Sequence, residues 1–109
     1  MTSQRMNQLM EEILTEISKT RTSGQKEYAH SEENVFANFE RVASTLDITR
    51  ETALMTYLLK HVDGISSHVK GHKSQREDVR GRLTDAIVYL TLLWGMIKDE
   101  EAKSKNLES

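Results

Sequence analysis

Cysteine and proline are absent from this chain of 109 residues, and glycine occurs only five times. A chain without cysteine has no disulfide framework and no thiolate metal site. A chain without proline lacks the residue that most strongly interrupts helices, so an all-helical fold is favoured. No apolar run is long enough to span a bilayer, and the N-terminal residues lack the layout of a signal peptide. We therefore expect a cytoplasmic protein that has no membrane partner.

Charge of neither sign is in large excess, because 15 Lys and Arg residues stand against 17 Asp and Glu residues. Proteins that bind nucleic acid through its phosphates usually carry a basic balance or a basic patch, so direct nucleic-acid binding is not expected. The length fits one helical domain over residues 1–109. We expect an ordered core over about residues 3–99 and a polar, frayed tail over 100–109.

Apolar residues recur with helical spacing in four segments, and no segment alternates long enough to predict a strand. We expect helices over about 3–20, 32–46, 50–69 and 75–99, with a loop over 20–30. The predicted N-terminal caps are Ser31 for the second helix, Asp47 or Thr49 for the third, and Ser74 with Glu77 for the fourth. Gly71 is predicted to end the third helix. The short connections predict an all-α fold, either an antiparallel four-helix bundle or two packed helical hairpins.

The third and fourth of these helices each have a distinct apolar face. The stripe on the third helix consists of Leu54, Leu58, Val62, Ile65 and Val69. The face on the fourth helix is wider and consists of Val79, Leu83, Ala86, Ile87, Leu90, Trp94 and Ile97. A monomer of this size would struggle to cover the whole of the wider face, so we expect a homo-oligomer.

Polar residues border that wide face. Asp78, Arg82, Asp85 and Tyr89 follow one another at i, i+4, i+7 and i+11, which places them on one narrow stripe of the helix. An intrahelical ladder from Asp78 through Arg82 to Asp85 is one interpretation, and it accounts best for the first two residues. Apolar residues surround Asp85, so we expect this carboxylate to be half buried and to need a cation, a metal or several hydrogen-bond donors.

A second face of the third helix combines small residues with an aromatic ring and a cation. Its members are Ala53, Tyr57, Lys60, Gly64 and Ser67, with Asp63 beside them. One interpretation is a helix–helix interface in which Lys60 pairs with Asp63 or Asp85. The other is a pocket in which Lys60 contacts an anion and Tyr57 or Tyr89 contacts a ring. His61 follows Lys60, and because no zinc-binding pattern accompanies it, we expect a packed or ligand-facing histidine.

The segment "GQKEYAH" holds Lys26, Tyr28 and His30 shortly before the expected N-terminus of the second helix. Helix N-termini attract phosphate groups, and a loop with a cation and an aromatic ring could close over a nucleotide. The other interpretation of this segment is an ordinary solvated connector.

Three stretches, "KEYAHSEENVFANFE", "YLLKHVDGI" and "REDVRGRLTDAIVYLTLL", occur in this order between about residues 25 and 97. In order and spacing they resemble the phage-borne helical family called nucleotide-modification-associated domain family one. That family is itself distantly similar to the all-α nucleoside triphosphate pyrophosphohydrolases, the MazG-like and dimeric dUTPase-like enzymes. The resemblance implies a MazG-like fold and a role in phage nucleotide chemistry.

Those enzymes hold Mg²⁺ with a Glu-x-x-Glu pair on one helix and a Glu-x-x-Asp pair on the next, and they cleave between the α and β phosphates. By resemblance, Asp85 matches the final aspartate, but Arg82 stands in place of the glutamate three positions earlier. Lys60 and His61 stand where the first acid is expected, and Asp63 replaces the second.

Two hypotheses follow from this incomplete match. Cations in place of metal-binding acids favour binding of a nucleotide, a cyclic nucleotide or a nucleotide-derived signal of host defence, which the protein would sequester. The residues expected to bind it are Lys26, Tyr28, Asn34, Asn38, Tyr57, Lys60, His61, Arg82, Asp85 and Tyr89. The alternative is a Mg²⁺-dependent pyrophosphohydrolase that uses Asp63, Glu77 and Asp85. A third possibility is a structural or partner-binding helical oligomer.

Overall fold

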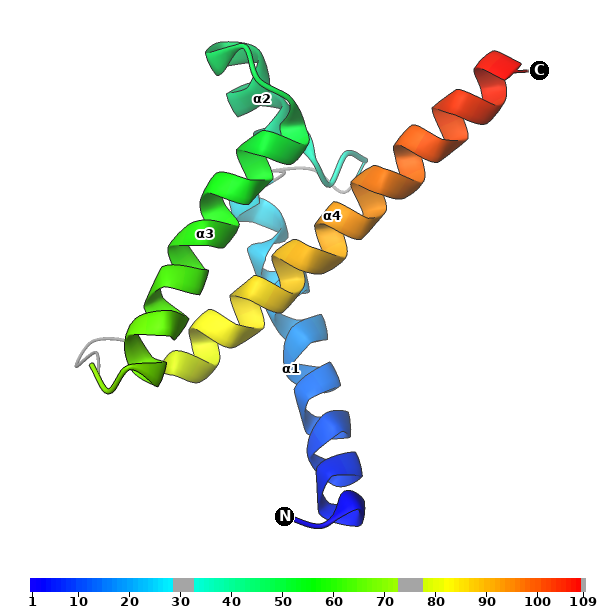
Figure 1. The fold of residues 1–109 in the computed structure, drawn as a ribbon. Helices are drawn as coiled ribbons and strands as arrows, with labels where there is room; N and C mark the ends of the chain where they lie inside the picture. The colour runs from blue at the N-terminus through cyan, green and yellow to red at the C-terminus, as the bar shows by residue number, and fades with distance from the viewer. Residues whose placement is uncertain (29–32, 73–77, 109) are drawn as a thin grey trace.

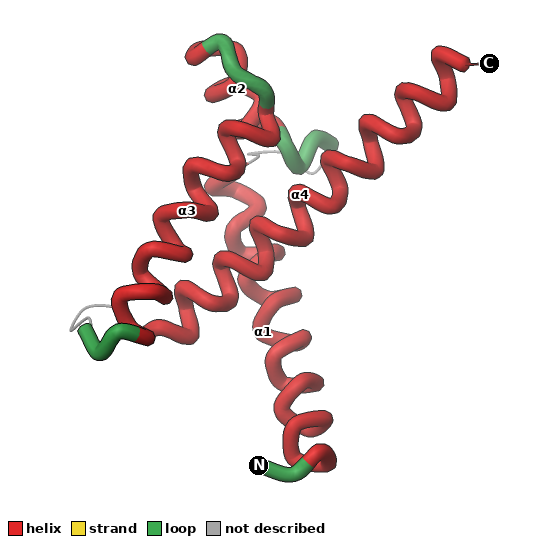
Figure 2. Tube along the Cα trace, viewed as in Figure 1, coloured by secondary structure: helices red, strands yellow, loops and turns green. Residues whose placement is uncertain are grey.

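The computed structural model of the protein describes residues 1–28, 33–72 and 78–108, and the side chains of residues 1–24, 33–72 and 78–106. It has four helices: α1 (Ser3–Tyr28), α2 (Ala37–Leu46), α3 (Arg50–Val69) and α4 (Val79–Glu108) (Figure 1). The three described segments contain no strand, as Figure 2 shows. The predicted all-α fold with four helices is therefore confirmed. No helix in the described part of the chain is long and apolar enough to cross a membrane.

The helices α3 and α4 lie side by side and run in opposite directions (Figure 1). The helix α1 crosses this pair and packs on α4 and α2. The N-terminal half of α1 and the C-terminal half of α4 both extend beyond the other helices (Figure 1). The molecule is consequently elongated, with principal extents of 50 × 32 × 24 Å.

The predicted boundaries of α3 are confirmed at both ends. At the N-terminus the Thr49 hydroxyl accepts a hydrogen bond from the Thr52 amide at 3.1 Å, an interaction worth about 1 kcal/mol. At the C-terminus Gly71 has a φ of 96°, a conformation that favours glycine. The amide of Gly71 donates to the His68 carbonyl and the amide of His72 donates to the Ser67 carbonyl, both at 2.9 Å. This pair of bonds is the Schellman motif, which satisfies the last carbonyls of a helix.

The helix α1 does not end near Thr20, as the sequence predicted, but continues through Gly24 to Tyr28. The hydroxyl of Thr22 donates to the Ser18 carbonyl at 2.9 Å, and the hydroxyl of Ser23 donates to the Lys19 carbonyl at 2.5 Å. Hydroxyl side chains that bond to the preceding turn fit inside a helix, and a single helical glycine costs only about 1 kcal/mol. The expected loop over 20–30 is therefore wrong as far as residue 28.

The start of α2 and both ends of α4 also differ from the prediction. The helix α2 begins at Ala37 rather than after Ser31, and the Asn34 side chain organises the preceding turn by accepting from the Phe36 amide at 3.1 Å. The helix α4 begins at Val79, capped by Asp78, whose carboxylate accepts from the Arg80 amide at 2.8 Å. The predicted caps Ser31, Ser74 and Glu77 lie outside the described residues.

The C-terminal residues extend α4 to Glu108, so the predicted end of this helix near residue 99 is wrong. Seven of the nine residues 100–108 are Glu, Lys, Ala or Leu, which are strong helix formers. An i, i+3 ion pair between Glu100 and Lys103 at 3.5 Å adds to the helical preference.

The core lies where α2, α3 and α4 meet, and its largest fully buried side chains are Phe39, Leu54 and Met96. On α4 the buried residues are Ala86, Val88, Leu92 and Met96. Only Ala86 among them belongs to the predicted apolar face, so the prediction assigned the wrong side of this helix to the core. Most of the residues assigned to that face are at least 42% exposed: Leu83, Leu90, Trp94 and Ile97. The helix α4 is apolar around most of its circumference, so periodicity alone could not select the side that packs on α3.

The predicted apolar stripe of α3 is confirmed in its N-terminal half, where Leu54 is fully buried and Leu58 is 6% exposed. Farther along the helix Val62 and Val69 are 40% and 78% exposed, and Ala53, which the sequence placed on the second face, is fully buried. The side chain of Gly64 is a single hydrogen, which allows Arg82 of α4 to lie across α3 at this point. Among the small residues of the predicted second face, Gly64 therefore provides space for a side chain of α4.

A nearly buried arginine connects three helices. The Arg50 side chain of α3 is only 10% exposed, and its guanidinium lies 3.0 Å from the Glu40 carboxylate of α2 and 3.1 Å from the Glu100 carboxylate of α4. The same group lies 5.0 Å from the centre of the Phe36 ring. Burial opposes the charge, but the hydrogen bond to Glu40 and the nearby carboxylates outweigh it and raise the pKa of Arg50 above its ordinary value.

Candidate functional site

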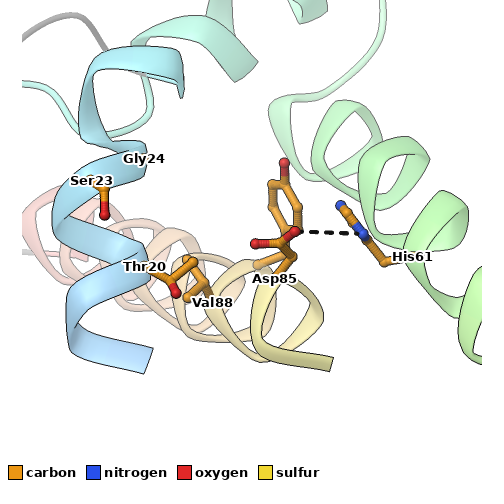
Figure 3. Close-up of a pocket in the computed structure, with 7 residues that line it drawn as sticks. Thr20, Ser23, Gly24, His61, Asp85 and Val88 are labelled. Atoms are coloured by element: carbon orange, nitrogen blue, oxygen red, sulfur yellow. Dashed lines mark ion pairs between the residues drawn. The ribbon is translucent and has the colours of Figure 1, made fainter. Parts of the chain in front are cut away.

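A pocket of about 390 Å³ lies between α1, α3 and α4 (Figure 3). Thr20, Ser23 and Gly24 line it from α1, His61 lines it from α3, and Asp85, Val88 and Tyr89 line it from α4. The three residues on α1 follow i, i+3, i+4 spacing, and so do the three on α4, which places each group on one face of its helix. Figure 3 shows Asp85 between the α1 residues and His61. The pocket therefore depends on three helices that are far apart in sequence.

Stacked aromatic rings form one wall of the pocket. The Tyr89 ring stacks on the His61 ring, with 5.5 Å between centroids and an interplanar angle of 29°. Tyr57, one turn before His61, stacks on Tyr89 at 6.2 Å and 15°. The buried Phe39 ring meets Tyr57 and Tyr89 edge-on, at 5.7 and 6.0 Å. Because Phe39 belongs to the core, it holds these two rings in place, and such pairs are favourable arrangements of aromatic rings.

His61 and Asp85 are the two titratable side chains that face each other across the pocket. The Nδ1 atom of His61 lies 3.9 Å from the Oδ2 atom of Asp85, as the dashed line in Figure 3 marks. This separation is too long for a hydrogen bond. The His61 side chain is 16% exposed and its buried Nδ1 has no hydrogen-bond partner, whereas the Asp85 side chain is 43% exposed. The expectation that Asp85 would be half buried is confirmed, and its neighbour is His61.

Arg82 lies beside this site on the same helix as Asp85. A methyl group added to Gly64 would lie 2.5 Å from Cδ and 2.6 Å from Cζ of Arg82, so this side chain passes directly over Gly64. Gly64 is one turn after His61 on α3. The Arg82 guanidinium is thus packed next to the pocket on the side of α3.

Asp78 does not form the predicted ladder with Arg82. Its carboxylate instead pairs with Arg80 at 3.3 Å. The hydrogen bond from the Arg80 amide, followed by the Arg80 charge, holds the pKa of Asp78 below its ordinary value. The role of Asp78 is to cap α4.

Four of the predicted ligand-binding residues come together on α3 and α4: Tyr57, His61, Asp85 and Tyr89. Lys60 and Asp63 are exposed and do not line the pocket. Asn38 is half-buried on α2, and Asn34 is exposed and donates to the Glu40 carboxylate at 2.6 Å. The side chains of Lys26 and Tyr28 and the whole of Glu77 lie outside the described part of the chain.

The sequence prediction missed the wall that α1 supplies. Thr20, Ser23 and Gly24 were assigned to a loop, so their common helix face could not be recognised. The signal was present, because a threonine, a serine and a glycine at i, i+3 and i+4 form a small hydroxyl-bearing patch in an otherwise amphipathic pattern.

No three His, Asp or Glu side chains among the described residues lie close enough together to hold a metal ion. The expected magnesium set of Asp63, Glu77 and Asp85 includes Glu77, which the structure does not describe. The magnesium site therefore stays a prediction.

Comparison with known proteins does not place this chain in a family. No protein-family model, no curated protein and no solved structure matches it. The resemblance to nucleotide-modification-associated domain family one therefore stays a prediction from the three sequence stretches.

Proposed function

We propose that this protein binds a nucleotide or a nucleotide-derived molecule in the pocket between α1, α3 and α4. The observation that supports the proposal most strongly is the stacked pair of His61 and Tyr89 beside the Asp85 carboxylate. Flat rings offer a surface on which a base can stack, and a carboxylate accepts hydrogen bonds from the amino and imino groups of a base. A volume of about 390 Å³ lies within the usual range for small-molecule sites.

The remaining groups suit the polar parts of such a ligand. The hydroxyls of Thr20 and Ser23 lie on the α1 wall. The Thr20 hydroxyl can donate to a phosphate oxygen, and the Ser23 hydroxyl, which donates to the Lys19 carbonyl, can accept from a sugar hydroxyl. Arg82 packs next to the pocket, and its planar guanidinium matches the geometry of a phosphate group. Lys60 is exposed one residue before His61, and in this proposal it binds the outer phosphates.

The proposal includes a MazG-like relationship and an origin in a phage, both of which rest on the resemblance of the three sequence stretches. It favours binding over hydrolysis, because Lys60, His61 and Arg82 stand where the related enzymes have acids. In a phage such a protein would sequester a nucleotide signal of host defence or handle a modified nucleotide.

Calorimetric titration with nucleoside mono-, di- and triphosphates and cyclic nucleotides, with and without Mg²⁺, tests the proposal. Asp85→Asn should weaken the best ligand about tenfold or more, because it removes a charged acceptor. Asp47→Asn is the matched control, because Asp47 lies outside the pocket in a left-handed conformation that asparagine tolerates. The control should bind like the unchanged protein.

Mass spectrometry of the ligand after incubation separates the alternatives. Intact ligand recovered after heating the protein supports binding, whereas released pyrophosphate and a monophosphate support the hydrolase. Absence of heat change and of turnover with the whole panel contradicts both and leaves a structural role. Equal weakening by Asp85→Asn and Asp47→Asn would show that the ligand binds elsewhere.

A further inference from the structure

An apolar stripe runs along α4 on the side that no other described helix covers. Leu83, Leu90, Trp94 and Ile97 are 42%, 50%, 76% and 50% exposed, and Ile87, between them, is half-buried. Successive members are separated alternately by four and three residues, which is the spacing of a coiled-coil seam. Contiguous exposed apolar residues of this kind mark interaction sites on proteins.

The stripe faces away from the body of the molecule from Leu83 to Trp94, and at its C-terminal end Ile97 lines an open groove beside Thr49 and Glu51 at the N-terminus of α3. Residues two apart on a helix project about 200° apart, and Leu90 and Trp94 each lie two positions from the buried Leu92. Trp94 is likewise two positions from Met96, which is fully buried against the core. A partner helix can therefore reach the stripe without displacing α3.

Charges at the two ends of the stripe identify the partner and its direction. The same alternating spacing places Arg80 before Leu83 and Glu101 after Ile97, and both are exposed. If a second α4 lies antiparallel, with Leu90 against Leu90, Arg80 of each copy is level with residue 100 of the other, one residue or about 1.5 Å along the axis from Glu101. A parallel arrangement would instead place Arg80 against Arg80 and Glu101 against Glu101, and like charges at such positions oppose pairing.

The apolar positions have the same two-fold relation. In the antiparallel arrangement Leu83 lies opposite Ile97, and Ile87 lies within one residue of the level of Trp94, so each large side chain of one copy meets an apolar one of the other. A surface that is complementary to itself about its own centre is the requirement for a two-fold symmetric dimer. No unrelated partner is needed to explain this match.

We propose that two copies of this protein pair through the α4 stripe in an antiparallel arrangement centred on Leu90. The pocket residues Asp85 and Tyr89 lie on the other side of α4, so each copy keeps its own pocket open. The dimer thus presents two pockets, and its formation does not depend on what they bind.

Sedimentation velocity of the full chain over a concentration series measures the dimer. Leu90→Lys places two charges against each other on the symmetry axis and should raise the dimer dissociation constant about tenfold or more, as loss of a central anchor does. Leu46→Lys is the control, because Leu46 is 63% exposed on α2 and lies outside the stripe. Circular dichroism should show equal helicity for both variants, since both positions are exposed.

Two further measurements test whether the two α4 helices run antiparallel. Arg80→Glu should weaken the dimer and the double variant Arg80→Glu with Glu101→Arg should restore it, which a parallel pair would not show. The chain has no cysteine, so a mixture of the Leu83→Cys and Ile97→Cys proteins should oxidise to the mixed disulfide in preference to either homodimer.

Three results would overturn the proposal. The first is a monomer at every concentration, the second is a dimer that Leu90→Lys leaves intact, and the third is preferential Leu83→Cys homodimer formation. None of them bears on nucleotide binding, which calorimetry of the Leu90→Lys variant measures separately.

Discussion

Replacement of Arg50 by methionine removes the charge that connects α2, α3 and α4 while it keeps an apolar stem of similar length. The guanidinium pairs with Glu40 at 3.0 Å and Glu100 at 3.1 Å and lies 5.0 Å from the Phe36 ring centre. Arg50 itself is 10% exposed, but the two carboxylate side chains are 40% and 54% exposed, so solvent screens each pair. We assign about 1 kcal/mol to Glu40 and about 0.5–1 kcal/mol each to Glu100 and Phe36.

The expected loss in free energy of unfolding for Arg50→Met is therefore about 2–3 kcal/mol. Urea denaturation followed by circular dichroism measures it at a protein concentration where the association state is known. Arg41→Met is the matched control, because Arg41 is exposed on α2 and should change the free energy by no more than about 0.5 kcal/mol.

A double-mutant cycle isolates the strongest pair. The coupling between Arg50→Met and Glu40→Gln should be about 1 kcal/mol and should fall as salt is added, because the Glu40 side chain is 40% exposed. A loss below about 0.5 kcal/mol for Arg50→Met would refute the reasoning, since it would equal that of an ordinary surface substitution. A coupling energy that does not change with salt would refute only the claim that the Arg50–Glu40 interaction is electrostatic.

Three further predictions concern glycine, helix capping and pH. Gly81→Ala, which meets no atom within 4 Å, should stabilise the fold by about 0.5–1 kcal/mol. Gly64→Ala has the same helical gain but must displace the flexible end of the Arg82 side chain, so its free energy of unfolding should be about 1 kcal/mol below that of Gly81→Ala, which thermal melts of the two variants check. Thr49→Ala should cost about 1 kcal/mol through loss of the α3 cap, measured by urea denaturation against Thr49→Ser, which keeps the hydroxyl. The pKa of Asp78 is lower in the folded protein than in the unfolded chain, where it is about 3.9. Its carboxylate therefore adds to the free energy of unfolding above that pH, and this contribution is lost as the pH falls through the lower pKa of the folded state. Asp78→Ala should therefore flatten the acid side of the stability–pH curve, and an unchanged acid side would contradict this assignment.

Helix ends set by local chemistry could be predicted well. Thr49 caps α3 through a bond to a residue three positions on, and Gly71 ends it through its own left-handed conformation. Both interactions lie within a few residues of the chain, so the sequence contains all the information that they need. At the start of α4 the Asp78 carboxylate accepts from the Arg80 amide, and the predicted cap Ser74 lies outside the described residues.

The continuation of α1 past Thr20 could not be predicted in this way. A cluster of threonine, serine and glycine is compatible with a loop or with a helix, and the difference between the two is small. Packing of α1 against α4 favours the helix here. Because this end of α1 supplies Thr20, Ser23 and Gly24, the error also hid one wall of the pocket.

The amino-acid pattern alone was sufficient to predict four helices, the ends of α3 and the half-burial of Asp85. These follow from periodicity, capping and the apolar neighbours of one carboxylate, all of which act over one or two helical turns. Which side of α4 is buried, and that His61 rather than Lys60 approaches Asp85, follow only from the packed fold. The reason is that α4 is apolar on two opposite sides, and only contact with Phe39, Leu54 and α1 makes one of them the core and leaves the other exposed.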